Sequence, residues 1–406
     1  MSKIDIIKAY YRIKPFINKT PLELNERLSN KFGANIFLKR EDLQKTRSFK
    51  IRGSLNKIIK ETNCGKDKKH IVCASAGNHA QGVAYACNLM GLESNIFVPT
   101  ITPPQKIGRI RNFGNNMELL RIGNDFDECL LEAKNFSDAN NFLFIHPYND
   151  LDIIEGQGTL AYEIKQDLSP NMIISSIGGG GLISGLSSYQ NNYKLIGVEP
   201  YCAESMYYAI KNNKPTCLKY LDTFVDGASV RKVGDITFNI MKNKLALNDI
   251  KIIDNGLLCH EMIKLYQEEG IITEPAGCLS VAALNQLNKE EIKGKNIVCI
   301  ISGGNNDIMR YPEILEKNLI YLGVKHYYII KFSQKPKELK KFILNVLEEN
   351  DDITRFEYIK KTNKNYGNVL VGLETKNNLL LEEKLNENNF TFKKIDENDL
   401  IYSYLV

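Results

Sequence analysis

Short apolar segments alternate with amphipathic ones over residues 35–301 of this chain. Apolar segments of strand length occur at 35–39, 70–75, 95–99, 117–122 and 142–146, and again at 172–177, 194–199 and 296–301. The segments between them have helical periodicity, as at 126–139 and 155–165. Parallel strands need a crossover between them, so this order with short links predicts open sheets whose strands are mostly parallel. Two such runs indicate two α/β halves with a cleft between them.

The pattern changes after Tyr321. Predicted strands at 324–332, 352–361, 368–374 and 390–395 alternate with predicted helices at 336–347 and 378–388. This is the βαββαβ order of a ferredoxin-like α+β domain. A chain of 406 residues has room for more than one core. We therefore predict an α/β domain over 1–320 and an α+β domain over 324–406.

Composition excludes several classes of function. The net charge of +5, from 53 basic and 48 acidic residues, is mild, and no basic block carries interleaved aromatics, so we expect no nucleic-acid partner. Charges interrupt residues 1–16 every few positions, which predicts neither a signal peptide nor a membrane span and favours the cytoplasm. The nine cysteines are scattered without a C-x-x-C pair, as expected for buried thiols in a reducing compartment. The histidines do not cluster with them, so we expect no transition-metal site.

Lys50 lies at the centre of RSFKIRGS, where a polar turn leads into an amphipathic segment. A lysine at this place can point into the cleft and form a Schiff base with a carbonyl compound. The common alternative is a solvated surface lysine.

Four consecutive glycines follow the apolar segment 172–177 and precede LISGL. They are Gly178, Gly179, Gly180 and Gly181. Without a Cβ, their backbone N–H groups can approach a phosphate at a helix N-terminus. The sequence has neither the lysine of a P-loop nor the glycine spacing of a dinucleotide fingerprint, which leaves another phosphorylated cofactor. The alternative is a flexible glycine turn.

Two polar residues stand at further strand ends. Asn78, in SAGNHAQG, follows the segment 70–75, and its amide can donate to an oxygen, although a helix N-cap is an equal alternative. The neighbouring backbone N–H groups could bind a carboxylate, and they belong to Ser75, Ala76, Gly77 and His79. Ser302 ends the last apolar segment, where its hydroxyl could face a ring nitrogen or simply begin a turn.

An amine, a phosphate cradle, an amide donor and a hydroxyl together suit pyridoxal 5'-phosphate. The sequence resembles the pyridoxal-phosphate enzymes of the tryptophan-synthase-β type, and among them the biosynthetic threonine ammonia-lyases. The resemblance rests on LKREDLQKTRSFKIRG, SAGNHAQGVA, FIHPYND, EGQGT, GGGGLISG, DGASV, EPAGCLSVAAL, SGGNND and NDDITRFEYIKK. It implies a two-subdomain fold of type II with an ACT-like regulatory domain. It also implies that Lys50 carries the cofactor, Asn78 contacts the ring hydroxyl, Gly178–Gly181 with Leu182 hold the phosphate, and Ser302 faces the pyridine nitrogen.

The resemblance implies β-elimination of L-threonine to 2-oxobutanoate and ammonia, the first step of isoleucine biosynthesis, with the freed Lys50 amine removing the α-proton. A hydroxyl at Ser302 holds no proton on the ring nitrogen, which disfavours transamination. The alternatives are a serine dehydratase or a serine racemase on the same fold, and, from another class, a non-catalytic amino-acid sensor. In racemase relatives a serine stands where this chain has Ala76, so we expect elimination without efficient racemisation.

Two positions depart from the family. The ACT-like domain implies L-isoleucine as an effector and a homotetramer, but Lys337 replaces the usual glycine, so we expect weak inhibition. In racemase relatives a cation is held by residues matching Glu199 and Ala203 and by an acid at the position of Ser205. Glu204 is the nearby acid that could compensate, and we expect no metal.

Overall fold

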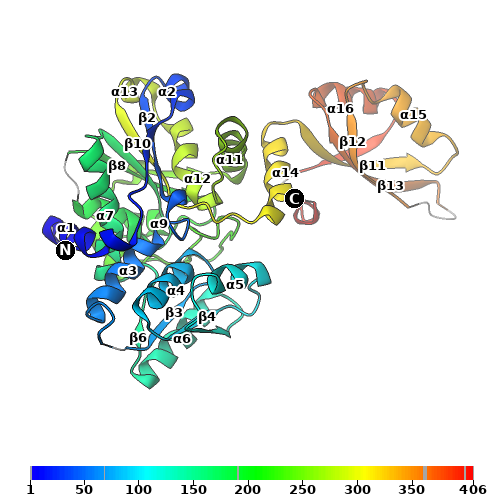
Figure 1. Cartoon of the computed structure of the whole chain (residues 1–406). Coiled ribbons are helices and arrows are strands. Elements are labelled where there is room, and N and C mark those ends of the chain that lie inside the picture. Colours follow the sequence, from blue (N-terminus) through cyan, green and yellow to red (C-terminus); the bar gives the residue numbers. More distant parts are fainter. Residues whose placement is uncertain (1, 68, 190–191, 360–363, 397–398, 406) are drawn as a thin grey trace. The chain divides into compact units, whose positions relative to one another are not determined.

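The computed structural model describes residues 2–67, 69–189, 192–359, 364–396 and 399–405 (Figure 1). They fall into two units, residues 1–307 and 308–406, each with its own sheets and core. Each unit is described by itself.

A six-stranded sheet forms the larger half of the first unit. Its order is β1 (Leu22–Leu24), β2 (Asn35–Arg40), β10 (Asn296–Ile301), β7 (Met172–Ser176), β8 (Lys194–Pro200) and β9 (Ile250–Ile253). All neighbours are parallel except β1 and β2. The segment 35–39 was predicted to open the first run of strands, but β2 pairs along its whole length with β10 of the second run. The pairing buries Ile36 and Leu38, which explains why this strand joins a sheet distant in sequence.

A four-stranded parallel sheet forms the smaller half. Its order is β5 (Met117–Arg121), β4 (Ser94–Val98), β3 (Ile71–Ala74) and β6 (Leu143–Phe144). The connecting helices are α4 (Asn78–Met90), α5 (Pro104–Arg111) and α6 (Phe126–Asn140). The prediction of two α/β halves with mainly parallel strands is therefore confirmed.

Helices α1 (Lys3–Ile13), α3 (Lys50–Glu61), α7 (Leu151–Asp167) and α8 (Gly181–Tyr189) pack on one another in the first unit. Glycines let α7 approach both of its neighbours. A Cβ at Gly156 would lie 2.5 Å from the carbonyl oxygen of Arg52 in α3, and one at Gly185 of α8 would lie 2.5 Å from the nitrogen of Gly158. The glycines of the EGQGT motif in α7 thus let the backbones of α3 and α8 pack directly against the backbone of α7. The other helices of this unit are α2 (Glu26–Phe32), α9 (Ser205–Lys211), α10 (Asp235–Met241), α11 (Asn255–Glu269), α12 (Pro275–Ala282) and α13 (Lys289–Ile292).

Four fully buried charged side chains connect β2, α3 and α7. The Arg52 guanidinium donates to both carboxylate oxygens of Glu41 at 2.8 Å and to those of Glu163 at 2.8 and 2.9 Å. Lys39 donates to Glu163 at 2.8 Å and to the carbonyl oxygen of Thr20 at 2.6 Å. All four charged side chains have a relative exposure of 0%. Two positive and two negative charges therefore balance inside the protein. One of them, Arg52, lies two residues after Lys50 in α3.

The second unit begins with α14 (Tyr311–Tyr321) and continues as β11 (Lys325–Ser333), α15 (Glu338–Asn345), β12 (Asp352–Tyr358), β13 (Tyr366–Glu374), α16 (Asn378–Glu387) and β14 (Thr391–Ile395). The strands form one antiparallel sheet in the order β12-β13-β11-β14, which confirms the βαββαβ prediction. Its core includes Tyr328, Ile330, Phe332 and Phe342. Residues 360–361 of the predicted strand lie outside the described residues. Within the described ranges of both units, no helix is both long and apolar enough to cross a bilayer.

Arg52→Met should lower the free energy of unfolding by about 3–5 kcal/mol, because Glu41 and Glu163 would stay buried without their main cation. Denaturant unfolding followed by far-UV circular dichroism measures this change. Arg355→Met is the matched control, because the Arg355–Glu357 pair has side-chain exposures of 37% and 55%. That control should cost less than about 1 kcal/mol. Equal losses in both variants would contradict the importance of the buried cluster.

Candidate active site

Lys50 is the first residue of α3, and the segment before it is paired with the segment after β10. The N–H of Phe49 donates to the carbonyl oxygen of Ser302 at 3.1 Å, and the N–H of Gly304 donates to that of Arg47 at 2.9 Å. Arg47 adopts a positive φ of 54°, which makes the turn into α3. The backbone therefore brings Lys50 and Ser302 together, as the sequence analysis predicted for one site.

The Lys50 amine is partly buried and donates to the carbonyl oxygen of Pro147 at 2.8 Å. Burial lowers its pKa to about 8, although the nearby charge of Glu274 acts in the opposite direction. Burial and the charge of Lys50 also lower the pKa of His79 to about 3 and that of His146 to about 4. Both imidazoles are therefore neutral at pH 7. An amine with this pKa is available as a nucleophile or base near neutral pH.

The turn at residues 146–149 holds the acceptor for Lys50 in place. His146 Nδ1 accepts from the backbone N–H groups of Tyr148 at 3.2 Å and Asn149 at 2.9 Å. These bonds need an unprotonated Nδ1, in agreement with the lowered pKa of this histidine. Asn149 Oδ1 accepts in turn from the N–H of Ile236 at 2.9 Å, so this turn connects the Lys50 region to α10.

The four glycines lead into the N-terminus of α8. Within the described part of the chain, none of the backbone N–H groups from Gly178 to Leu182 donates to another protein group. This set of donors fits a phosphate. The glycines are also required by packing, because a Cβ at Gly179 would lie 2.2 Å from the Tyr148 ring. Gly180 has a φ of 91°, which favours glycine directly.

Asn78 is the first residue of α4, and the N-cap position is occupied by Gly77. The Asn78 amide Nδ2 donates to Glu274 Oε1 at 2.7 Å, and its Oδ1 accepts from Asn305 at 2.7 Å. The alternative that Asn78 is an N-cap is therefore wrong. Ser75 Oγ accepts from the N–H of Gly77 at 3.1 Å, and a Cβ at Gly77 would meet no atom within 4 Å.

Ala76 and His79 complete this segment. Ala76 is partly buried, and His79 is buried with its Nε2 donating to the carbonyl oxygen of Ile145 at 2.9 Å. The N-terminal N–H groups of α4 have no partners within the helix, so they can receive a carboxylate.

Ser302 lies directly after β10 and is 2% exposed. Its Oγ donates to the carbonyl oxygen of Ala276 at 3.2 Å and accepts from Ser176 Oγ at 3.4 Å. Both hydrogen bonds are longer than the usual O–H···O distance of about 2.5–3.0 Å. The hydroxyl is therefore available for exchange with a better partner.

Two residues of this region, Glu274 and Tyr148, were not predicted from the sequence. Glu274 is 7% exposed at the start of α12, and burial, with the charge of Asp226, raises its pKa to about 7. The signal was present in EPAGCLSVAAL, where an acid precedes a helix whose only polar side chain is that of Ser280. Tyr148 lay in FIHPYND, but its contact with the glycines follows only from the three-dimensional fold.

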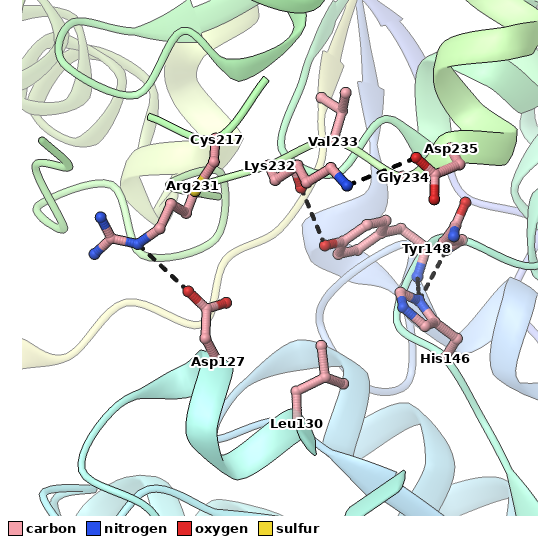
Figure 2. A pocket seen from close by; sticks show the side chains of 11 residues that line it. Asp127, Leu130, His146, Tyr148, Cys217, Arg231, Lys232, Val233, Gly234 and Asp235 are labelled. Atoms are coloured by element: carbon pink, nitrogen blue, oxygen red, sulfur yellow. Dashed lines mark hydrogen bonds and ion pairs between the residues drawn. The ribbon is translucent and has the colours of Figure 1, made fainter. Parts of the chain in front are cut away.

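A pocket of about 320 Å³ opens beside this site between the two halves of the first unit (Figure 2). Asp127 and Leu130 come from α6, and Tyr148 comes from the turn after β6. The opposite wall comes from Cys217 and residues 231–235. Arg231 Nε and Asp127 Oδ2 are 3.4 Å apart across the pocket, and Tyr148 Oη donates to the carbonyl oxygen of Lys232 at 3.3 Å.

Glu199, at the end of β8, uses both carboxylate oxygens on the start of α9. They accept from the N–H groups of Met206 at 2.7 Å and Tyr207 at 2.9 Å. Ala203 precedes α9, and Ser205 is its first residue. Burial raises the pKa of Glu199 to about 8. The carboxylate is engaged by backbone donors, and no cluster of at least three metal-ligating side chains occurs in the described ranges.

Comparison with known proteins gives consistent matches over both units. The family described as "Pyridoxal-phosphate dependent enzyme" matches residues 13–303, and "C-terminal regulatory domain of Threonine dehydratase" matches residues 316–405. The chain is 45% identical to L-threonine dehydratase biosynthetic IlvA of Staphylococcus epidermidis, over 100% of this chain and 99% of that protein.

Two solved structures have a similar fold. One is the processed form of threonine deaminase isoform 2 from Solanum lycopersicum, with a TM-score of 0.73, 34% identity, and coverage of 78% of this chain and 87% of that one. The other is serine racemase from Dictyostelium discoideum, with a TM-score of 0.69, 29% identity, and coverage of 76% and 99%.

Because the pKa of Lys50 is lowered, we expect its amine to react with an amine-directed reagent at a lower pH than ordinary lysines do. In protein freed of small ligands, half of the Lys50 amine should be neutral at a pH of about 8, whereas an ordinary lysine reaches this point near about 10.4. Competitive labelling at graded pH, with the peptide containing Lys50 quantified by mass spectrometry, measures the midpoint. A midpoint above about 10 would show that burial does not perturb this amine.

Proposed function

Because this chain belongs to the pyridoxal-phosphate-dependent enzyme family and eliminates ammonia from L-threonine, we propose that the site around Lys50 carries out that reaction. The observation that carries the proposal is the Lys50 amine, held at 2.8 Å by the carbonyl oxygen of Pro147 with a pKa lowered to about 8. The product, 2-oxobutanoate, places the reaction at the first step of isoleucine biosynthesis.

The residues present fit the cofactor at each of its polar groups. The unpaired N–H groups from Gly178 to Leu182 would hold the phosphate, and Asn78 would donate to the ring oxygen. Ser302 would meet the ring nitrogen with a neutral hydroxyl, which does not fix a proton there. When bound, pyridoxal phosphate supplies an electron sink that acidifies the α-carbon of the substrate amino acid.

The protein's own groups orient the substrate and move its proton. The prediction that the N–H of Ser75 is a carboxylate donor is wrong, because it donates to the carbonyl oxygen of Phe97 at 3.0 Å, and the N–H of Gly77 donates to Ser75 Oγ. The N–H groups of Ala76 and His79 would receive the substrate carboxylate. Lys50 would accept the α-proton, because its lowered pKa leaves a useful neutral fraction near neutral pH. His79 is neutral and bonded to Ile145, so its role is to shape the site rather than to transfer a proton.

Lys50→Ala tests this assignment. The variant should keep its far-UV circular dichroism spectrum, lose the visible absorption of bound pyridoxal phosphate, and convert L-threonine to 2-oxobutanoate more than about 10³-fold more slowly, because it lacks both anchor and base. Lys57→Ala, which removes an amine from the same helix that pairs with Asp150 and Asp152, is the matched control. Native turnover in Lys50→Ala would refute the role of Lys50.

Serine racemase is the second candidate, favoured by the similar structure from Dictyostelium discoideum. Racemisation needs a second acid or base on the face opposite Lys50. The position assigned to that group by resemblance is Ala76, whose methyl side chain has no proton to give. We therefore expect that, from L-serine, the protein forms pyruvate at least about tenfold faster than it forms D-serine. Chiral chromatography of the products measures the ratio, and comparable rates would favour the racemase.

We further propose that residues 1–320 act as the catalytic domain and residues 324–406 as an ACT-like regulatory domain. The second unit of the structure already begins at residue 308 and includes α14, whose Glu316 accepts from Lys325 at 2.6 Å and from Tyr327 at 2.5 Å. We propose L-isoleucine as its effector, the end product of the pathway that starts with this reaction.

Lys337 is the position to test for regulation. Its side chain is exposed, and its φ of 75° is left-handed, so a glycine would relieve about 1 kcal/mol of backbone strain at the start of α15. We expect isoleucine to inhibit the native protein weakly and Lys337→Gly about fivefold more strongly, because the loop loses a bulky side chain. Inhibition curves for both proteins and for Lys335→Gly, a control in the same loop, measure the effect. Strong native inhibition that the glycine leaves unchanged would exclude this position from the effector site.

We also propose that the protein is a cytoplasmic homotetramer. Helix α15 exposes Leu339, Ile343 and Leu344 at 39%, 45% and 66%, which would suit pairing of the regulatory domains. Sedimentation equilibrium measures the assembly, and a monomer at micromolar concentration would contradict it.

A further inference from the structure

Glu274 is a buried carboxyl group that the reaction described above does not use. It belongs to the EPAGCLSVAAL motif, precedes α12, and is 7% exposed. Its backbone N–H donates to the carbonyl oxygen of Gly303 at 3.1 Å, next to Ser302. A Cβ at Gly303 would lie 2.4 Å from Glu274 Oε1, so the backbone there leaves room for the carboxyl group. A buried carboxyl placed so closely needs a stabilising partner.

Two donors meet the carboxyl group, the backbone N–H of Asn305 and the side-chain amide of Asn78. The amide Nδ2 of Asn78 donates to Glu274 Oε1 at 2.7 Å. On its other side, Asn78 Oδ1 accepts from Asn305 Nδ2 at 2.7 Å, and the same Asn305 nitrogen donates to the carbonyl oxygen of Thr46 at 2.9 Å.

This chain of hydrogen bonds has one consistent direction. A backbone carbonyl can only accept, so Thr46 requires the nitrogen of Asn305 to face it. The same nitrogen has two N–H groups for three acceptors, because Gln81 Oε1 also lies 3.1 Å from it, so Asn305 alone does not force the oxygen of Asn78 to face it. An ionised carboxylate can only accept, so Glu274 is the group that requires the nitrogen of Asn78. Within the described residues Asn78 Nδ2 has no other protein acceptor, so one of its two N–H groups remains available.

We infer that Glu274 is a positioning residue that fixes the Asn78 amide with its nitrogen turned towards the cofactor's ring oxygen. The inference rests on the proposed role of Asn78 as the donor to that oxygen. Without an acceptor at residue 274, rotation of the Asn78 amide by half a turn would present an oxygen where a donor is needed. The pKa of Glu274 is raised to about 7, so near neutral pH its carboxyl group is ionised in only a fraction of the molecules. A protonated carboxyl keeps a carbonyl oxygen that can accept but also gains an O–H donor, so the ionised form fixes the Asn78 amide more strictly.

The test is a double-mutant cycle on the full-length protein, with the dissociation constant of pyridoxal phosphate and the absorption maximum of the bound cofactor as readouts. Glu274→Ala should weaken cofactor binding about tenfold when Asn78 is present, the loss of one buried hydrogen bond. In an Asn78→Ala background the same change should cost less than about twofold, because no amide is left to orient. Glu274→Gln keeps an acceptor oxygen and should stay within about threefold of the native protein.

Glu261→Ala controls for a loss of stability, because Glu261 is another buried carboxyl of this unit and accepts from Lys31 and Asn285 at 2.8 and 2.9 Å. It should lower the unfolding midpoint without changing cofactor affinity or its absorption maximum.

Equal losses from Glu274→Ala in both backgrounds would overturn the inference, as would a Gln variant as weak as the Ala variant. If Asn78→Ala alone changes neither affinity nor absorption, the proposed role of Asn78 fails instead, so the two failures are distinguishable.

Discussion

The charge balance among Lys39, Arg52, Glu41 and Glu163 is the interaction on which the first unit depends. Four ionised groups without access to water are tolerated because Glu163 receives hydrogen bonds from both cations, and Glu41 receives two from Arg52 and one from the Thr20 hydroxyl. The cluster joins β2 of the larger sheet to α3 and α7. Lys50 begins α3, two residues before Arg52, so the cluster anchors the first turn of the helix that carries this lysine.

The site itself is built from chain segments that meet only in the folded state. Residues 47–49 pair with 302–304, the turn at 146–149 contacts both Lys50 and the glycines, and Asn78 reaches Glu274 across 196 positions of sequence. Each half of the first unit contributes to it. Such a site has little local stability of its own, so its geometry depends on the packing of the two halves.

Much of this organisation could be predicted from the sequence, because strand and helix periodicity and glycine-rich turns are local signals. Such signals predict the parallel halves and the βαββαβ tail. Together with family resemblance, they also identify candidate site residues such as Lys50, Asn78 and Ser302. The place of β2 could not be predicted, because its apolar residues suit either sheet and only the match with β10 decides between them. Asn78 was open between a capping and a donor role until the position of Glu274 was known. No periodicity reports a contact between an acid at the start of one helix and an amide at the start of another.

The contact between Tyr148 and Gly179 gives this glycine a structural role that is independent of any ligand. A side chain at Gly179 would overlap the tyrosine ring whether or not any ligand were present. Packing alone therefore requires a glycine at this position, apart from the proposed role of the glycine run in holding a phosphate. A relative that had abandoned pyridoxal phosphate but kept the aromatic residue would still have to keep its glycines. In surveys of distant homologues, the lysine rather than the glycine run is then the marker that tells working enzymes from descendants that have lost their catalytic role.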